Sequence, residues 1–176
     1  FKFNKIVFKD EKYYGQEVYF DCDYDSKKRQ LIFCVRPESV QETDAEGGKV
    51  HSFDELHDIT KIYLYNINTK EFKNIDNEGY CSNPRFIMNK IIYEAGNDIV
   101  VKDNYSSKGY FILKEIKKQD LMKEVELLTY ITTINKDLIL GGRYRDQEKE
   151  SYFIFKYDLN QKKIKGHIFK NPKRLL

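Results

Sequence analysis

One pattern occurs three times along the chain and restricts the folds it can adopt. Residues 18–36 (VYFDCDYDSKKRQLIFCVR), 82–96 (SNPRFIMNKIIYEAG) and 127–143 (LLTYITTINKDLILGGR) each read as a strand, a tight polar turn and a second apolar strand. A polar gap follows each one, and then another predicted hairpin: 61–75 (KIYLYNINTKEFKNI), 109–125 (GYFILKEIKKQDLMKEV) and 151–168 (SYFIFKYDLNQKKIKGHI). The sequence therefore predicts three units of four antiparallel strands.

The spacing and composition of these strands indicate how the units are arranged. The predicted third strands begin at Ile62, Tyr110 and Tyr152, a spacing typical of four-stranded propeller blades. The second strands, 31–35, 91–93 and 138–140, are apolar on both faces, so each needs cover on both sides, as stacked sheets provide. We expect an all-β, β-propeller-like fold of about three blades, in a partial or oligomer-completed ring. A β-sandwich or a barrel is the alternative.

A family resemblance supports the propeller interpretation. The hairpin 62–72 (IYLYNINTKEF), followed by 83–86 (NPRF) and 89–93 (NKIIY), resembles the blade pattern of TolB-like and prolyl-oligopeptidase-type β-propellers. The resemblance extends over nearly the whole chain as three units. The Trp-Asp dipeptide, the Kelch signature and the Asp-box of other propeller classes do not occur.

The units divide the chain as one β-repeat domain over residues 1–176. Residues 1–14 read as an extra strand, 17–75 as the first unit with an inserted loop at 37–60, 82–126 as the second unit and 127–169 as the third. Three stacked blades leave an apolar face uncovered on the first and last sheets. We therefore expect either a homodimer or further blades in a longer ring.

Charge and cysteine content exclude several classes of partner. The 31 basic and 28 acidic side chains give a net charge of +3 and are interspersed, so no nucleic-acid-binding surface is indicated. No apolar run is long enough to span a bilayer. Three cysteines match no zinc spacing, and Cys22 and Cys34 would form a disulfide only if their strands place them directly opposite.

The compartment is not decided by these features. The chain starts at Phe1 rather than Met, which leaves room for a leader, an anchor or a further domain upstream and favours an extracytoplasmic or cell-surface position. Unpaired cysteines would instead favour a reducing compartment.

The candidate binding residues lie in the long connections between predicted second and third strands. These connections, 37–60, 96–108 and 144–150, would lie at one end of the units, and binding residues concentrate on such loops. In the first, which is acidic, a capping box at Ser52 and Glu55 predicts a short helix. Two arginines at alternate positions of the third would face the same way and could grip an anion. The candidates are Asp54, His57, Asp58, Asp98, Asp103, Arg143, Tyr144 and Arg145.

The leading hypothesis is a non-catalytic protein- or peptide-binding or scaffold module that uses this long-loop face. Ser106 and Ser107 lack a Gly-x-Ser-x-Gly elbow, and no cofactor or metal set is indicated. The alternative is the propeller portion of a glycosidase or peptidase, in which Asp23, Asp98 or Asp103 would provide two carboxylates at a pocket.

Overall fold

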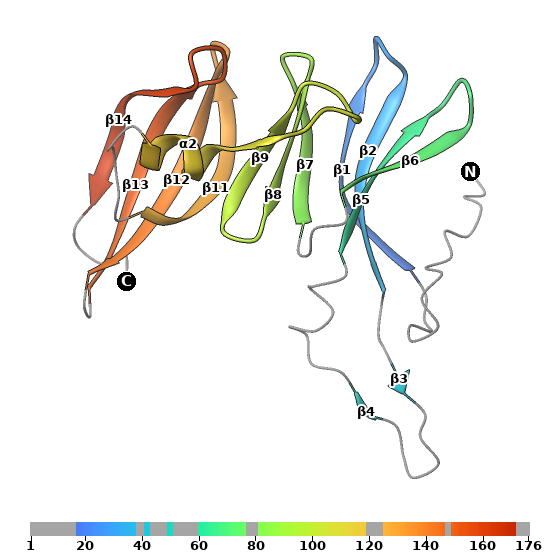
Figure 1. The fold of residues 1–176 in the computed structure, drawn as a ribbon, viewed down its shortest axis with the longest axis horizontal. Coiled ribbons are helices and arrows are strands. Elements are labelled where there is room, and N and C mark those ends of the chain that lie inside the picture. The colour runs from blue at the N-terminus through green and yellow to red at the C-terminus, as the bar shows by residue number, and fades with distance from the viewer. Residues whose placement is uncertain are drawn as a thin grey trace. The chain divides into compact units, whose positions relative to one another are not determined.

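The computed structural model describes residues 17–37, 41–42, 49–50, 60–76, 81–118, 125–146 and 149–171 (Figure 1). These residues form three four-stranded antiparallel sheets, one two-stranded ribbon and one short helix. The predicted all-β class and the repeated meanders are thus confirmed. The chain divides into two compact units, Phe1–Ser82 and Asn83–Leu176, which are described separately.

The first unit contains one four-stranded meander. Its strands β1 (Glu17–Asp25), β2 (Gln30–Pro37), β5 (Lys61–Asn66) and β6 (Glu71–Asp76) lie side by side in that order. The connection between β2 and β5 contains β3 (Gln41–Glu42) and β4 (Lys49–Val50), which pair with each other. On β2, consecutive residues 32–35 are all buried, so this strand is covered on both faces, as its composition predicts.

The register of β1 against β2 decides the cysteine question. An irregularity between Phe20 and Cys22 places Phe20 opposite Cys34 and Cys22 opposite Phe33. Cys22 is consequently exposed while Cys34 is buried, and none of the three cysteines forms a disulfide. The Cys34 thiol instead donates a hydrogen bond to the carbonyl oxygen of Cys81, at 3.5 Å.

Three hairpin turns share one local geometry. Between β5 and β6, Oδ1 of Asn66 accepts hydrogen bonds from the backbone N–H groups of Asn68 (2.9 Å) and Thr69 (3.2 Å), and Lys70 ends the turn with φ of 59°. Such Asx turns close a chain reversal without long-range contacts. Two further turns repeat this arrangement of a capping side chain and a basic residue at positive φ: Asp25 with Arg29, and Asp158 with Lys162.

The second unit contains two meanders joined by a helix. The first has the order β10-β9-β8-β7, from β7 (Cys81–Ile87, which starts at the end of the first unit), β8 (Lys90–Ala95), β9 (Asp98–Lys102) and β10 (Tyr110–Phe111). After α2 (Ile112–Lys118), the second has the order β11-β12-β13-β14, from β11 (Val125–Ile134), β12 (Asp137–Asp146), β13 (Lys149–Asp158) and β14 (Lys163–Asn171).

The predicted hairpin at 109–125 is wrong. Only Tyr110 and Phe111 are extended, and α2 follows them at once. The third strand of this sheet is β9, which falls inside the predicted long loop 96–108. The physical reason lies in the apolar spacing of α2: Ile112, Leu113 and Ile116 are all buried, which is a helical period rather than the alternation of a strand.

Two of the three predicted long connections are therefore short. β8 turns into β9 through Gly96 and Asn97, where Gly96 has φ of 57°. β12 extends to Asp146 and β13 begins at Lys149. Among the second-to-third connections, only that between β2 and β5 is long.

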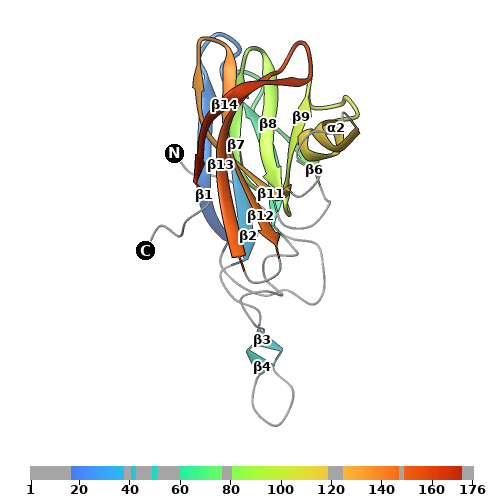
Figure 2. The same ribbon diagram turned by 90° about the vertical axis from the view of Figure 1, so that its left-hand side faces the viewer.

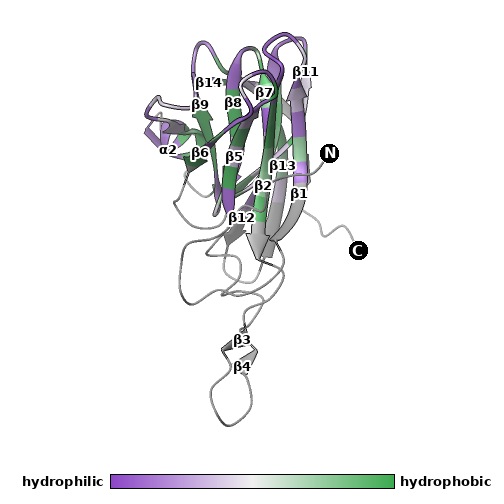
Figure 3. Cartoon of the chain, turned by 90° about the vertical axis from the view of Figure 1, so that its right-hand side faces the viewer, coloured by the Kyte–Doolittle hydropathy of each residue, from purple (hydrophilic) through white to green (hydrophobic). Residues whose placement is uncertain are grey.

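One apolar core joins the two sheets of the second unit. β9 contributes Ile99 and Val101, α2 contributes Ile112 and Ile116, and the remaining core residues include Leu138, Leu140, Phe155 and Tyr157 of β12 and β13. The helix α2 lies against β9, β11 and β14, and Figure 2 shows it beside β9. Figure 3 shows apolar residues along β8 and β9 and hydrophilic residues at the hairpin turns. Each described sheet is open, with two edge strands, so none forms the alternative barrel.

Candidate functional site

The structure places the candidate residues in different environments. Asp98, Asp103 and Arg143 have described side chains, and the backbones of Tyr144 and Arg145 belong to β12. Asp54, His57 and Asp58 lie outside the described residues. Asp98 and Asp103 stand at opposite ends of β9, so the five residues of this strand, at roughly 3.3 Å each, separate them.

Asp98 joins β9 to the helix that follows the sheet. Its carboxylate is buried, with 8% of the residue exposed, and Oδ1 accepts hydrogen bonds from the N–H groups of Ile99 (2.6 Å) and Leu113 (2.7 Å). Burial raises its pKa above the ordinary value, while the bonds from Leu113 and Ile99 act in the opposite direction. Asp98 thus satisfies a free N–H group in the first turn of α2, which is a structural role.

Asp103 forms an ion pair with Lys90. Lys90 begins β8 and Asp103 follows the end of β9, and the register of Ile91 opposite Lys102 brings the two together. The hydrogen bond from the Lys90 ammonium group lowers the pKa of Asp103 below its ordinary value. The Asp103 side chain is 73% exposed, so this pair is a solvated contact across two strands rather than a pocket.

The arginine pair lies on a strand rather than on a loop. Arg143 stands opposite Leu127 on β11 and Tyr152 on β13, and Arg145 stands opposite Glu150. Arg143 itself is half-buried. That the side chains of Arg143 and Arg145 face the same way stays a prediction from alternation along a strand, because the side chain of Arg145 lies outside those described.

A second ionic cluster was not among the candidates. The Lys165 ammonium group lies 2.9 Å from a carboxylate oxygen of Asp137 and 2.9 Å from one of Asp158. The pKa of Asp158 is lowered, first by the hydrogen bond from the N–H of Gln161 and then by Lys165, and the two carboxylates raise the pKa of Lys165. In the sequence, this cluster could have been found from Asp158, because this residue begins the Asx turn with Asn160 and Gln161.

Two tyrosines lie where β10 and β13 meet the core. Tyr110 is half-buried, its hydroxyl donates to the carbonyl oxygen of Leu159 (3.5 Å), and the Lys162 ammonium group lies 4.3 Å from its ring centre. Burial raises the pKa of Tyr110 to about 12 and also raises that of the fully buried Tyr157. Both phenols are therefore neutral near pH 7, which suits packing rather than proton transfer.

The His, Cys, Asp and Glu side chains are scattered over the part of the chain that the structure describes. There, no group of three or more His, Cys, Asp or Glu side chains is arranged to hold a metal ion. The helix α2 has 7 residues, and no helix among the described residues is long and apolar enough to cross a membrane.

Comparisons with known proteins leave the family open. No protein-family model, curated protein or solved structure matches this chain.

Proposed function

We propose that this chain is a non-catalytic binding or scaffold module that holds a protein or peptide partner through the connection between β2 and β5. The observation that carries the proposal is the contrast between this connection and the others. β2 ends at Pro37 and β5 begins at Lys61. Tight turns instead join the strand pairs β1–β2, β5–β6, β7–β8, β8–β9, β11–β12 and β13–β14. A long connection on a rigid sheet is the usual carrier of binding residues.

The charge of this connection supports a basic partner. Between β2 and β5 a single basic residue, Lys49, accompanies seven acidic residues: Glu38, Glu42, Asp44, Glu46, Asp54, Glu55 and Asp58. Complementary charge speeds encounter with a partner and selects among partners. We therefore assign a basic peptide or a basic protein surface as the partner class.

The roles of the described carboxylates also favour binding over catalysis. Asp98 caps α2 and Asp103 pairs with Lys90, and the length of β9 separates them. A glycosidase-type mechanism needs two carboxyl groups about 5–10 Å apart at one site. This pair therefore lends no support to the hydrolase alternative.

We interpret the three meanders as propeller-type blades. In the second unit, apolar side chains of one sheet pack against the next, and consecutive residues of β8 and β9 are buried on both faces. Stacked four-stranded blades have these two properties. This interpretation makes the sheets a rigid support for the connection.

A peptide-array screen with the full chain tests the binding proposal. The variant replaces the seven acidic residues of the connection with Asn or Gln, so that length is retained and the negative charge is lost. We expect the wild-type chain to bind basic peptides, with binding that falls as salt increases, and the variant to lose them. A chain in which Glu71 and Glu126, outside the connection, are changed to Gln is the control. Equal peptide binding by both variants would overturn the proposal.

A further inference from the structure

Four connections of the second unit lie at one end of its two sheets. The turn β7–β8 and the connection β9–β10 meet in the ion pair of Lys90 with Asp103. The connection β9–β10 also meets the turn β13–β14. There the hydroxyl group of Tyr110, which begins β10, donates to the carbonyl oxygen of Leu159 at 3.5 Å, and the Lys162 ammonium group lies over the Tyr110 ring. These three connections therefore adjoin one another.

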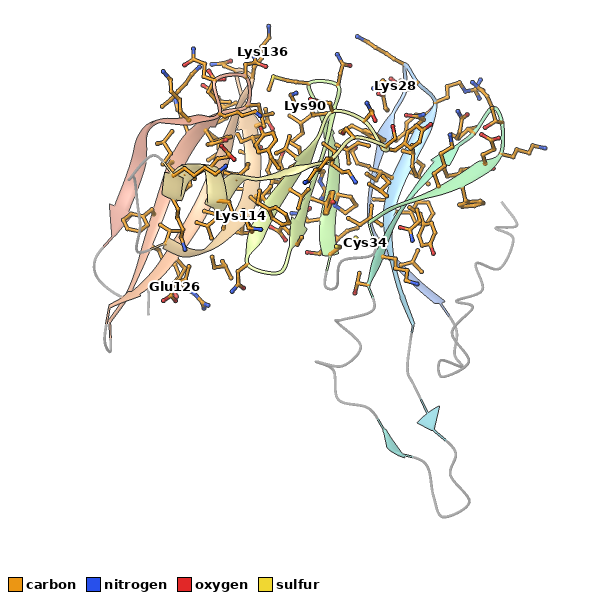
Figure 4. All side chains as sticks on the ribbon, in the orientation of Figure 1. Lys28, Cys34, Lys90, Lys114, Glu126 and Lys136 are labelled. Carbon is orange, nitrogen blue, oxygen red and sulfur yellow. The ribbon has the colours of Figure 1, made fainter. Side chains whose placement is uncertain are left out.

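The fourth connection, the turn β11–β12, adjoins the turn β13–β14. Asp137 stands opposite Asp158 across β12 and β13, and the Lys165 ammonium group lies 2.9 Å from a carboxylate oxygen of each. Figure 4 shows Lys90 and Lys136 together at this end of the second unit. We call the four connections and the residues that adjoin them the turn end, which consists of residues 87–90, 102–110, 134–137 and 158–165.

The turn end is basic. It contains three aspartates and no arginine, but seven lysines: Lys90, Lys102, Lys108, Lys136, Lys162, Lys163 and Lys165. Each of the three aspartates is bound by Lys90 or Lys165. The side chains of Lys108, Lys136 and Lys163 are exposed. The turn end therefore presents an excess of positive charge to a partner.

Two of these lysines occupy backbone positions that are unfavourable for them. Lys136 has φ of 69° and Lys162 has φ of 52°, a left-handed conformation that glycine or asparagine adopts more readily. Two turns thus keep a lysine where another residue would cost less. Residues that break a local rule in this way are expected where the side chain has a function.

The turn end also exposes an aromatic ring. Tyr105 is 41% exposed and lies between Lys102 and Lys108 in the β9–β10 connection. Tyrosine has an apolar ring and a polar hydroxyl group, and it is enriched at the headgroup level of membranes for this reason. Lysines around an exposed tyrosine fit a surface that is anionic outside and apolar beneath.

We propose that the turn end binds the surface of a bilayer that contains anionic lipids. Lysine acts as a point charge on a flexible stem, whereas planar recognition of one phosphate or carboxylate typically uses arginine. Seven lysines without an arginine suit a partner with many dispersed negative charges, and four connections at one end of the sheets contact such a surface together. The turn end belongs to the second unit and the β2–β5 connection to the first, so the proposal does not depend on the proposed function.

Vesicle titration of the full chain tests this inference. Vesicles of phosphatidylcholine with about 30% phosphatidylserine should bind the chain, and binding should fall as salt increases, since salt screens the surface potential. Vesicles of phosphatidylcholine alone should not bind it. A wild-type chain that binds neither kind of vesicle at low salt would overturn the proposal.

A charge-matched pair of variants tests the surface. Each lysine near an anionic bilayer strengthens binding roughly fivefold, so Lys108→Gln/Lys136→Gln/Lys163→Gln should weaken it by about 100-fold. The control is Lys114→Gln/Lys117→Gln/Lys118→Gln, which removes three exposed lysines from α2 and leaves the same net charge. It should bind as the wild type does. Equal losses in the two variants, both with the wild-type circular dichroism spectrum, would overturn the assignment of the turn end.

A fluorescence experiment shows which end of the second unit meets the lipid. The chain contains no Trp, so Tyr105→Trp gives it a single indole reporter at the turn end. The emission should shift to shorter wavelength with phosphatidylserine vesicles, because the ring enters the headgroup region. Unshifted emission from a vesicle-bound chain would overturn the proposal. Binding to polyglutamate or to a DNA duplex without binding to vesicles would also overturn it.

Discussion

The carboxylate of Asp98 accepts a hydrogen bond from the backbone N–H of Leu113 at 2.7 Å and so connects the first residue of β9 to the first turn of α2. This hydrogen bond holds the start of β9 against the first turn of α2 in the second unit. Asp98→Ala would leave the N–H of Leu113 without this acceptor. We expect the free energy of unfolding to fall by about 1–3 kcal/mol, measured by urea denaturation.

Asp103→Ala is the control for that substitution, because Asp103 is exposed and pairs only across the surface. Its effect should be much smaller. If both variants lose the same stability, the helix cap is not what makes Asp98 important.

The raised pKa of Asp98 predicts a specific pH dependence of stability. Because burial raises this pKa, the folded chain binds the proton more tightly than the unfolded chain. The stabilisation that comes from protonation of Asp98 is therefore complete below its unfolded pKa of about 3.9 and is lost as the pH rises through the folded pKa. We expect Asp98→Asn to flatten the stability curve across that window, measured by urea unfolding at closely spaced pH values. A curve parallel to the wild type would contradict the expectation.

The pair of Lys90 and Asp103 predicts the opposite sign. Its hydrogen bond lowers the pKa of Asp103, so the stabilisation is present above the unfolded pKa and is lost as the pH falls through the folded one. We expect Lys90→Met to raise the pKa of Asp103 towards its ordinary value, as followed by NMR titration of the carboxyl carbon. Lys108→Met, an exposed change in the same β9–β10 connection, should leave this pKa in place. An unchanged pKa in Lys90→Met would show that the pair does not form in solution.

The Asx turn between β5 and β6 predicts a measurable cost for its capping side chain. Asn66→Ala removes the acceptor of the bonds from Asn68 and Thr69, and we expect a loss of about 1 kcal/mol. Asn68→Ala, whose exposed side chain lies in the same turn, should have little effect on thermal unfolding. Equal losses would mean that the turn does not depend on the cap.

The left-handed residue of the same turn predicts a stabilising change. Lys70 has φ of 59°, a conformation that is unfavourable for residues with a Cβ atom and free of that penalty for glycine. Lys70→Gly should raise the free energy of unfolding by up to about 1 kcal/mol. A glycine introduced at Lys61, within β5, should instead destabilise the chain. A loss of stability in Lys70→Gly would show that the lysine side chain contributes more than the backbone strain costs.

Much of the local architecture follows from the sequence because its causes are local. Asp25, Asn66 and Asp158 begin turns whose hydrogen bonds reach only the next few residues. β2, beside the first of these turns, has the apolar composition of a strand that is covered on both faces. Hairpin positions could therefore be predicted correctly in the first unit and in the sheet β11–β14.

The candidate site could be predicted less well, because it rested on three long connections between strands. Two of these connections are short in the structure. The sequence predicts Asp98 in a loop, yet Asp98 is buried at the start of β9. Its role depends on Leu113, which lies beyond β9 and β10 in the chain and meets Asp98 only in the folded structure. The Lys165 cluster similarly needs β12, β13 and β14 in register before Asp137 and Asp158 lie side by side.

The sequence by itself determined the strand-rich class and the hairpin turns of the first unit and of the sheet β11–β14, since these depend on alternation and on side chains that bond to their own turns. At residues 112–118 the spacing of Ile112, Leu113 and Ile116 fits a helix, but in so short a run tertiary contacts were needed to decide it. An apolar run of this length is compatible with a strand or a helix. The choice was made by the Asp98 cap and by the burial of Ile112, Leu113 and Ile116 against β9, β11 and β14. Tertiary structure also decided which face of β11–β14 entered the core, because both faces carry apolar side chains and only one is covered within the second unit. Side chains extend from all these elements in Figure 4, where Lys90 and Lys136 mark two of the short hairpin turns and Lys114 marks α2.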